Sequence, residues 1–337
     1  MIKTTQEPKT ARAREVAKRL FRHEDATRTS VLIVIIAVLA VITKGASIGR
    51  GNIVNILLRA SNTGIAAIGQ FLVILTAGID ISIGGTAVFC MCFGAVLMTG
   101  TESAVAPFLA QITLPMVAAI MIMLLLGLGV GVINGLFISR LRIPPLILTI
   151  AMWQITLGGA FAVTTGNRVR GLPDALAFFG QGRVAGAPVP FIIFLVLVAI
   201  VYFILYHTAY GRSVYSVGGN PVSAWLSGVN IEKIRFSVYA ISGFLAALAG
   251  FVAMARTMIA GVDSIPTLML DTVAAVCVGG TSLFGGKGSL IGAIVGLAIL
   301  SVVSNGMNVI GLGTISQNAV RGIIIVTAVA IDVTRKR

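Results

Sequence analysis

Charged residues, above all acidic ones, are scarce in this sequence. Only 11% of its 337 residues are charged, and Asp and Glu together number 11. Soluble globular domains carry about 25% charged residues. The composition, which is 57% hydrophobic, therefore excludes a soluble globule.

Cysteine and histidine are scarce too, at three and two residues. Cys90, Cys92 and Cys277 all lie in apolar segments, so we expect small buried side chains and neither a disulfide framework nor a metal centre. His23 and His207 are isolated residues that flank apolar segments. Without a Ser/His/Asp, Cys/His or metal-ligand cluster, the sequence argues against a membrane enzyme, and we expect no cofactor.

A phosphate-binding loop is also missing. The glycine-rich segment VGGTSLFGGKGS (278–289) invites that interpretation, because Lys287 follows a pair of glycines. The motif G-x-x-x-x-G-K-[ST] would require Gly at position 281 and Ser or Thr at 288, but the chain has Thr281 and Gly288. No other stretch supplies the motif, so the chain has no phosphate-loop ATP site.

Long apolar runs are what the sequence has in abundance. The mean hydropathy is +1.01, and the runs are near the ~20 residues that a helix needs to cross the hydrocarbon core of a membrane. The segments are roughly 29–46, 62–77, 83–99, 114–139, 146–164, 190–206, 236–256, 267–283, 289–309 and 319–334. We therefore predict an all-α polytopic membrane protein of about ten transmembrane helices, with one membrane domain over residues 29–337.

The basic residues predict an orientation. Residues 1–28 are rich in Lys and Arg, and we expect a cytoplasmic basic arm that either lies on anionic lipid as a helix or stays solvated. With both termini in the cytoplasm, most of the 25 Lys and Arg residues fall on that side, as the positive-inside rule requires. This topology places residues 207–235 in the cytoplasm and the 165–189 loop outside. The net charge of +14 is thus explained by basic residues that orient the protein in the membrane, and it does not indicate nucleic-acid binding.

Residues 207–235 are the longest polar interruption and carry the signals of a short helix. Asn220 is a good N-cap, Pro221 suits the first helical position, and Gly228 is a natural left-handed stop. The apolar residues of this stretch share one helical face: Val222, Trp225, Leu226 and Val229. A two-turn helix with an apolar knob between membrane spans predicts a docking element.

Several polar side chains lie in or beside the spans. Asp80 falls in the break AGIDISIGG (77–85), and a charge at the bilayer centre costs roughly 2.5–3.5 kcal/mol, so it should line a cavity, cap a helix or find a partner. Asp271, at the outer start of a span, either orients a ligand or caps its helix. The candidates for a translocation path are Asp80, Ser82, Asn134, Gln154, Asp271, Asn305 and Asn308. The alternative for each is a hydrogen bond between membrane helices.

Linked motifs in a fixed order run from about residue 51 to 334. They are NIVNILLRASNTGIAAIGQFLVILTAGIDISIGG (52–85), GVINGLFISRLRIPPLILTIAM (131–152), YGRSVYSVGGNPVSAWLSGVNIEKIRFSVYAISGFLAALAG (210–250), LDTVAAVCVGGTSLFGGKGSLIGAIVG (270–296) and SNGMNVIG (304–311). In these motifs the chain resembles the permease subunit of ribose-type ATP-binding cassette (ABC) importers. It departs from that family at Ile81 and Ile83, where Leu and Val are usual, and at Val222, Ser223 and Trp225, where small or charged residues are usual. Trp225 is the sharpest departure.

The resemblance implies a partnership. A ten-span, homodimeric or pseudo-dimeric permease of the bacterial inner membrane would work with a cytoplasmic ABC ATPase and a periplasmic sugar-binding protein. It also implies that the segment from Gly211 to Gly228 engages the ATPase. The residues expected to do so are Gly211, Arg212, Gly218, Gly219, Asn220, Pro221, Trp225, Leu226, Ser227 and Gly228.

We expect the cargo to be a monosaccharide, a pentose or hexose, or a related polyol. A path lined by Asn, Gln, Thr and Ser with few charges suits a ligand that has many hydroxyls and no charge. A branched-chain amino acid or an autoinducer-like molecule with a carboxylate would want a fixed cation, and the spans offer only Arg256 and Arg321 near the outer face. From a different class, an ion-coupled secondary transporter would use Asp80 and Asp271 as coupling carboxylates.

Overall fold

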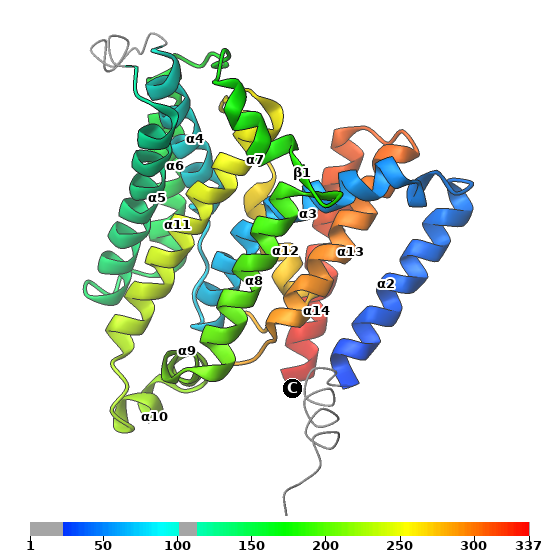
Figure 1. Ribbon diagram of the computed structural model, residues 1–337. Coiled ribbons are helices and arrows are strands. Elements are labelled where there is room, and N and C mark those ends of the chain that lie inside the picture. Colours follow the sequence, from blue (N-terminus) through cyan, green and yellow to red (C-terminus); the bar gives the residue numbers. More distant parts are fainter. Residues whose placement is uncertain (1–22, 101–112, 337) are drawn as a thin grey trace, which may run out of the picture.

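The computed structural model describes residues 23–100 and 113–336, which form a bundle of helices (Figure 1). The helices are α2 (His23–Ile42), η1 (Ala46–Ile48), α3 (Arg50–Leu75), α4 (Ile83–Thr99), α5 (Met116–Ser139), α6 (Pro145–Thr164), η3 (Asp174–Leu176), α7 (Ala177–Gln181), α8 (Val189–His207), α9 (Ala209–Gly219), α10 (Pro221–Leu226), α11 (Ile231–Thr257), α12 (Leu268–Val278), α13 (Leu290–Val309) and α14 (Thr314–Lys336). A hairpin of two short strands is the one sheet in the described ranges: β1 (Arg183–Val184) and β2 (Ala187–Pro188).

The predicted all-α class is confirmed, because each of the ten predicted segments coincides with a helix. Six described helices are both long enough and apolar enough to cross a membrane: α3, α5, α6, α8, α11 and α13. The apolar stretches of α2 (from Arg28), α4 and α12 are shorter. Length and composition therefore establish a multi-pass protein without establishing the predicted count of ten spans.

Helix α3 begins at Arg50, well before the predicted start at residue 62. Polar residues interrupt the apolar pattern there but do not interrupt the helix, and Asn52 Nδ2 donates to the Ser47 carbonyl at 2.6 Å. The longer helix carries Arg59 and Asn62 into the body of the protein, where neither is fully exposed.

Helices α3 and α11 form the buried centre of the bundle. Helix α5 packs against α11 through glycines, since a Cβ on Gly127 would lie 2.6 Å from the Gly243 carbonyl and a Cβ on Gly131 would overlap the Tyr239 carbonyl. A Cβ on Gly296 in α13 would likewise overlap the Ala275 carbonyl of α12. Small residues at these positions thus let the helices approach at backbone distance.

The two ends of the bundle differ. Helices α9 and α10 lie at one end, together with the start of α2 and the C-terminal end of α14 (Figure 1). This agrees with the prediction that both termini share a side with residues 207–235; residues 1–22 of the predicted basic arm lie outside the described residues. The 165–189 loop lies at the other end and contains η3, α7 and the hairpin, elements that the sequence did not predict.

The 165–189 loop is tied to the segment that links α11 to α12. Val169 and Ala260 exchange two backbone hydrogen bonds, at 2.7 and 3.1 Å. Arg168 forms an exposed ion pair with Asp263, and its hydrogen bond lowers the pKa of that carboxyl. At the end opposite α9 and α10, these contacts join the two loops to each other.

Candidate functional site

Helix α10 has the caps that its sequence predicts. Asn220 Oδ1 accepts a hydrogen bond from the Ser223 amide at 3.0 Å, and Pro221 occupies the first helical position. Ser227 is the C-cap, and Gly228 follows in the left-handed region with a φ of 81°. These local contacts fix the helix without help from a distant segment.

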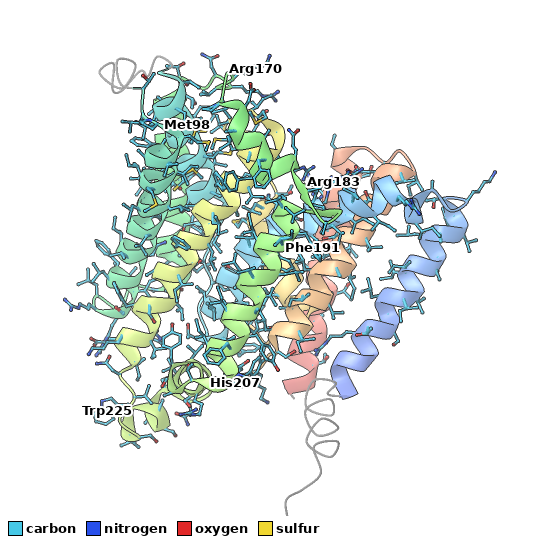
Figure 2. The ribbon with its side chains drawn as sticks, in the orientation of Figure 1. Met98, Arg170, Arg183, Phe191, His207 and Trp225 are labelled. Atoms are coloured by element: carbon cyan, nitrogen blue, oxygen red, sulfur yellow. The ribbon has the colours of Figure 1, made fainter. Side chains whose placement is uncertain are left out.

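The apolar face of α10 points away from the bundle. Val222, Trp225 and Leu226 are 67%, 66% and 74% exposed, whereas Ala224 behind them is buried. Figure 2 shows Trp225 at the tip of this end of the molecule. Three large apolar side chains on one short, rigid helix make a surface suited to a protein groove.

Helix α9, which the sequence did not predict, holds α10 against the membrane bundle. A Cβ on Gly218 would overlap the carbonyl oxygen of Leu75 at the end of α3 and lie 2.6 Å from the Gly286 amide. The Gly286 amide in turn donates to the Leu75 carbonyl at 2.9 Å. Tyr215 adds a hydrogen bond to the Gly288 carbonyl at 3.0 Å. Helix α9 thus contacts the backbone at the end of α3 and in the glycine-rich 278–289 segment.

The predicted ATPase-contact residues therefore divide into two groups. Gly211 and Gly218 are buried and serve close packing, because a Cβ on Gly211 would overlap the Leu205 carbonyl. Arg212, Trp225 and Leu226 are exposed and accessible to a partner.

Substitution Gly218→Ala should destabilise the protein by about 1–3 kcal/mol, because the added methyl group overpacks a backbone contact. The matched control is Gly219→Ala, where a Cβ would meet nothing nearer than Gly286 Cα at 3.9 Å. The control should be neutral or slightly stabilising, since Ala favours helix over Gly. Thermal unfolding of the detergent-purified variants measures both, and equal unfolding temperatures would disprove the tight contact.

Asp80 lies in a buried hydrogen-bonded cluster between α3 and α4. Its Oδ1 accepts from the Ser82 amide at 3.0 Å and the Ser82 hydroxyl at 2.6 Å, and its Oδ2 accepts from Ser242 Oγ of α11 at 2.7 Å. Asn134 Nδ2 of α5 donates to Ser82 Oγ at 2.9 Å. Asp80 is only 1% exposed. Three of the path candidates thus belong to one buried hydrogen-bonded cluster: Asp80, Ser82 and Asn134.

The remaining path candidates lie apart from this buried cluster. Gln154 is exposed on α6, and Asn305 is buried on α13 with its Nδ2 unpartnered among the described residues. Asn308 is exposed and accepts from Gln317 Nε2 at 2.7 Å. Asp271 Oδ1 lies 3.2 Å from Arg321 Nε, and its Oδ2 accepts from Thr267 Oγ1 at 2.9 Å. The seven candidates do not form one continuous path in a single chain.

Two cavities lie at opposite ends of the bundle. One, of about 750 Å³, lies beside α10 and is lined by Trp225, Arg142, Arg235 and Tyr239 among others. The other, of about 230 Å³, lies between α3, the end of α11, the start of α12 and α13, and Asp271 is on its wall. Because α11 runs from α10 to the opposite end (Figure 1), the second cavity is in the outer half.

Residues 52–329 match the family model described as the branched-chain amino acid transport system permease component. The chain belongs to this family. The family resemblance noted in the sequence is thereby confirmed. Membership implies an ATPase and a substrate-binding protein as partners, and the permeases are membrane subunits that are not themselves catalytic.

Relatives of this permease have been named for their cargo. This chain is 36% identical over 285 residues to the ribose import permease of Escherichia coli K12. The aligned residues cover 83% of this chain and 85% of that protein. This chain is 32% identical over 322 residues to the fructose import permease of Rhizobium meliloti (93% and 86%). It is 32% identical over 305 residues to the D-allose permease of E. coli K12 (90% and 89%). No solved structure matches the chain.

Sequence reasoning missed two features of this permease. Ser242 gives no signal as the partner of Asp80, since it is one small polar residue in an apolar run. Arg59 could have been found, because it is a basic residue within the long helix α3. It precedes the apolar run that the sequence predicted from residue 62, so it was not placed inside a span. Both become functional candidates once the fold brings distant helices together.

Proposed function

We propose that this protein is the membrane-spanning permease subunit of an ATP-driven importer that carries a monosaccharide across the bacterial inner membrane. The observation that carries the proposal is its similarity, over more than four fifths of its length, to permeases for ribose, fructose and D-allose. The family name alone would also fit a branched-chain amino acid, a polyol or an autoinducer-like cargo.

The exposed face of α10 supports docking to a cytoplasmic ATPase. Val222, Trp225 and Leu226 would enter a groove of the ATPase, as the apolar side of an amphipathic helix does. Closure of two ATPase subunits on ATP would then move α10. Helix α9 would pass that movement to α3 and to the 278–289 break, because it meets both at backbone distance.

The same proposal includes two copies of the permease, each with a basic arm at residues 1–28 in the cytoplasm next to membrane lipid and a membrane domain at 29–337. A periplasmic sugar-binding protein would deliver cargo to the outer end. Ion coupling is the weaker alternative, because both of its carboxylates are engaged: Asp80 accepts three hydrogen bonds and Asp271 is paired with Arg321.

Uptake in proteoliposomes tests the function. With the ATPase and the sugar-binding protein added, at least one radiolabelled monosaccharide from a panel of D-ribose, D-fructose, D-allose and D-glucuronate should accumulate, and only when ATP is supplied. A protonophore should leave the rate unchanged. Uptake by the permease alone that collapses with the protonophore would establish ion coupling instead. ATP-driven uptake of L-leucine without uptake of any sugar would establish amino-acid cargo.

A further inference from the structure

The lining of the outer cavity holds more positive than negative charge. Arg59 of α3 and Arg256 of α11 line it, and neither has a carboxylate within ion-pair distance in the described ranges. Asp271 is the only carboxylate among its described lining residues, and Arg321 already pairs with it. The site therefore has two guanidinium groups beyond the Asp271–Arg321 pair and no second carboxylate among its described lining residues.

These charges act on one another. Arg59 is close enough to Arg256 and Arg321 to be repelled by both, and Asp271 attracts it only in part. A charge at membrane depth is expensive, and ionisable residues there generally serve function. A cluster of like charges is stabilised when an anion binds between them, so the arrangement favours an anionic ligand.

The rest of the wall suits hydroxyl groups. Asn62 is 8% exposed, and its Oδ1 has no hydrogen-bond partner in the described part of the chain. Thr63, Ser301 and Ser304 place hydroxyls on the same wall. One unpartnered acceptor, Asn62 Oδ1, and three hydroxyl groups thus lie on the wall that Arg59 and Arg256 share.

We propose that this cavity binds a monosaccharide that carries a carboxylate, with Arg59 and Arg256 on the carboxylate and Asn62, Ser301 and Ser304 on the sugar hydroxyls. The inference rests on the proposed function and narrows its cargo to sugar acids. It revises the sequence expectation of an uncharged cargo, which counted Arg256 and Arg321 and did not place Arg59 with them. Guanidinium groups bind carboxylates through paired N–H donors, which gives direction as well as charge.

The size and charge of the cavity argue against three other kinds of cargo: large ligands, amino acids and neutral sugars. At about 230 Å³ it is below the roughly 300–1,000 Å³ of pockets for drug-sized ligands, so it accepts one small molecule. An amino acid would bring an ammonium group, and the one carboxylate in the lining is already paired with Arg321. A neutral sugar would leave the two guanidinium groups uncompensated.

Direct binding to the purified permease in lipid nanodiscs tests this without selection by the binding protein. The probes are D-glucuronate and D-glucose, which differ only in a carboxylate in place of a hydroxymethyl group. Saturation-transfer NMR should give a signal for bound D-glucuronate, and an excess of D-glucose should reduce that signal only slightly. Substitution Arg59→Gln should weaken D-glucuronate binding roughly 10- to 100-fold, the loss of one charge-assisted hydrogen bond, and Arg59→Lys should restore part of it.

The matched control is Arg50→Gln, an exposed arginine at the start of the same helix, which should bind D-glucuronate like the parent. If Arg59→Gln does not fold, Arg256→Gln and the comparison of the two probes on the parent protein give the same answer. Equal binding of D-glucose and D-glucuronate would overturn the inference and leave ATP-driven sugar uptake untouched. Arg59-dependent binding of L-leucine, or of phosphatidylglycerol with no competition from D-glucuronate, would also overturn it.

Discussion

Substitution Trp225→Glu should abolish ATP-driven uptake while the protein still inserts in the membrane. Trp225 is 66% exposed at the tip of α10 and packs little against its own chain, so a charge there costs the fold almost nothing. In a groove of the ATPase, the same carboxylate would be buried without a partner, and such burial costs several kcal/mol. Co-purification of the ATPase and uptake in proteoliposomes measure the loss.

The control is Trp225→Leu, which keeps an apolar side chain of smaller size at the same place. It should retain the ATPase with weakened affinity and a measurable uptake rate. Membrane yield and unfolding temperature should match the parent in both variants. Normal uptake by Trp225→Glu would show that α10 does not dock through this face.

Substitution Asp80→Leu should strongly destabilise the protein. It removes the acceptor of three hydrogen bonds and leaves the Ser82 amide and the hydroxyl protons of Ser82 and Ser242 without that acceptor. Each buried donor left unpaired costs about 1–3 kcal/mol. We expect a loss of about 3 kcal/mol or more, together with loosened contact of α11 with the 77–85 break, measured by thermal unfolding in detergent.

Asp174→Leu is the matched control, because Asp174 is exposed on η3 at the outer end. It should change stability by no more than about 0.5 kcal/mol, as surface substitutions usually do. Asp80→Asn should fall between the two, since it keeps one acceptor oxygen and the shape of the side chain. An unfolding temperature of Asp80→Leu equal to that of the parent would mean that the cluster contributes nothing to stability.

Local signals explain what the sequence predicted well. The caps of α10 depend on Asn220, Pro221 and Gly228, which all lie within nine residues of one another in the chain. The apolar segments depend only on composition and length. Each of these features is set by neighbours in sequence, so the pattern of residues was enough to predict them.

Distant contacts explain what it did not predict. Asp80 and Ser242 are 162 residues apart in the chain, and Asn134 is 52 residues from Ser82. The outer cavity needs α3, α11, α12 and α13 to converge before Arg59 and Arg256 share a wall. Helix α9 was missed for another reason, because its glycines at 211, 218 and 219 look like a loop until the backbone contacts that they permit are known.

The division between buried glycines in α9 and exposed side chains in α10 separates two properties that could have been tied together. In the proposed docking, the choice of ATPase would depend on the three exposed apolar residues of α10. The passage of movement into the bundle would depend on the backbone contacts of Gly218. Point substitutions on α10 can therefore change the choice of ATPase and leave the contacts of α9 with the bundle intact. A chimera that carries the α10 face of a related permease should accept the ATPase of that relative, which makes this importer a modular machine.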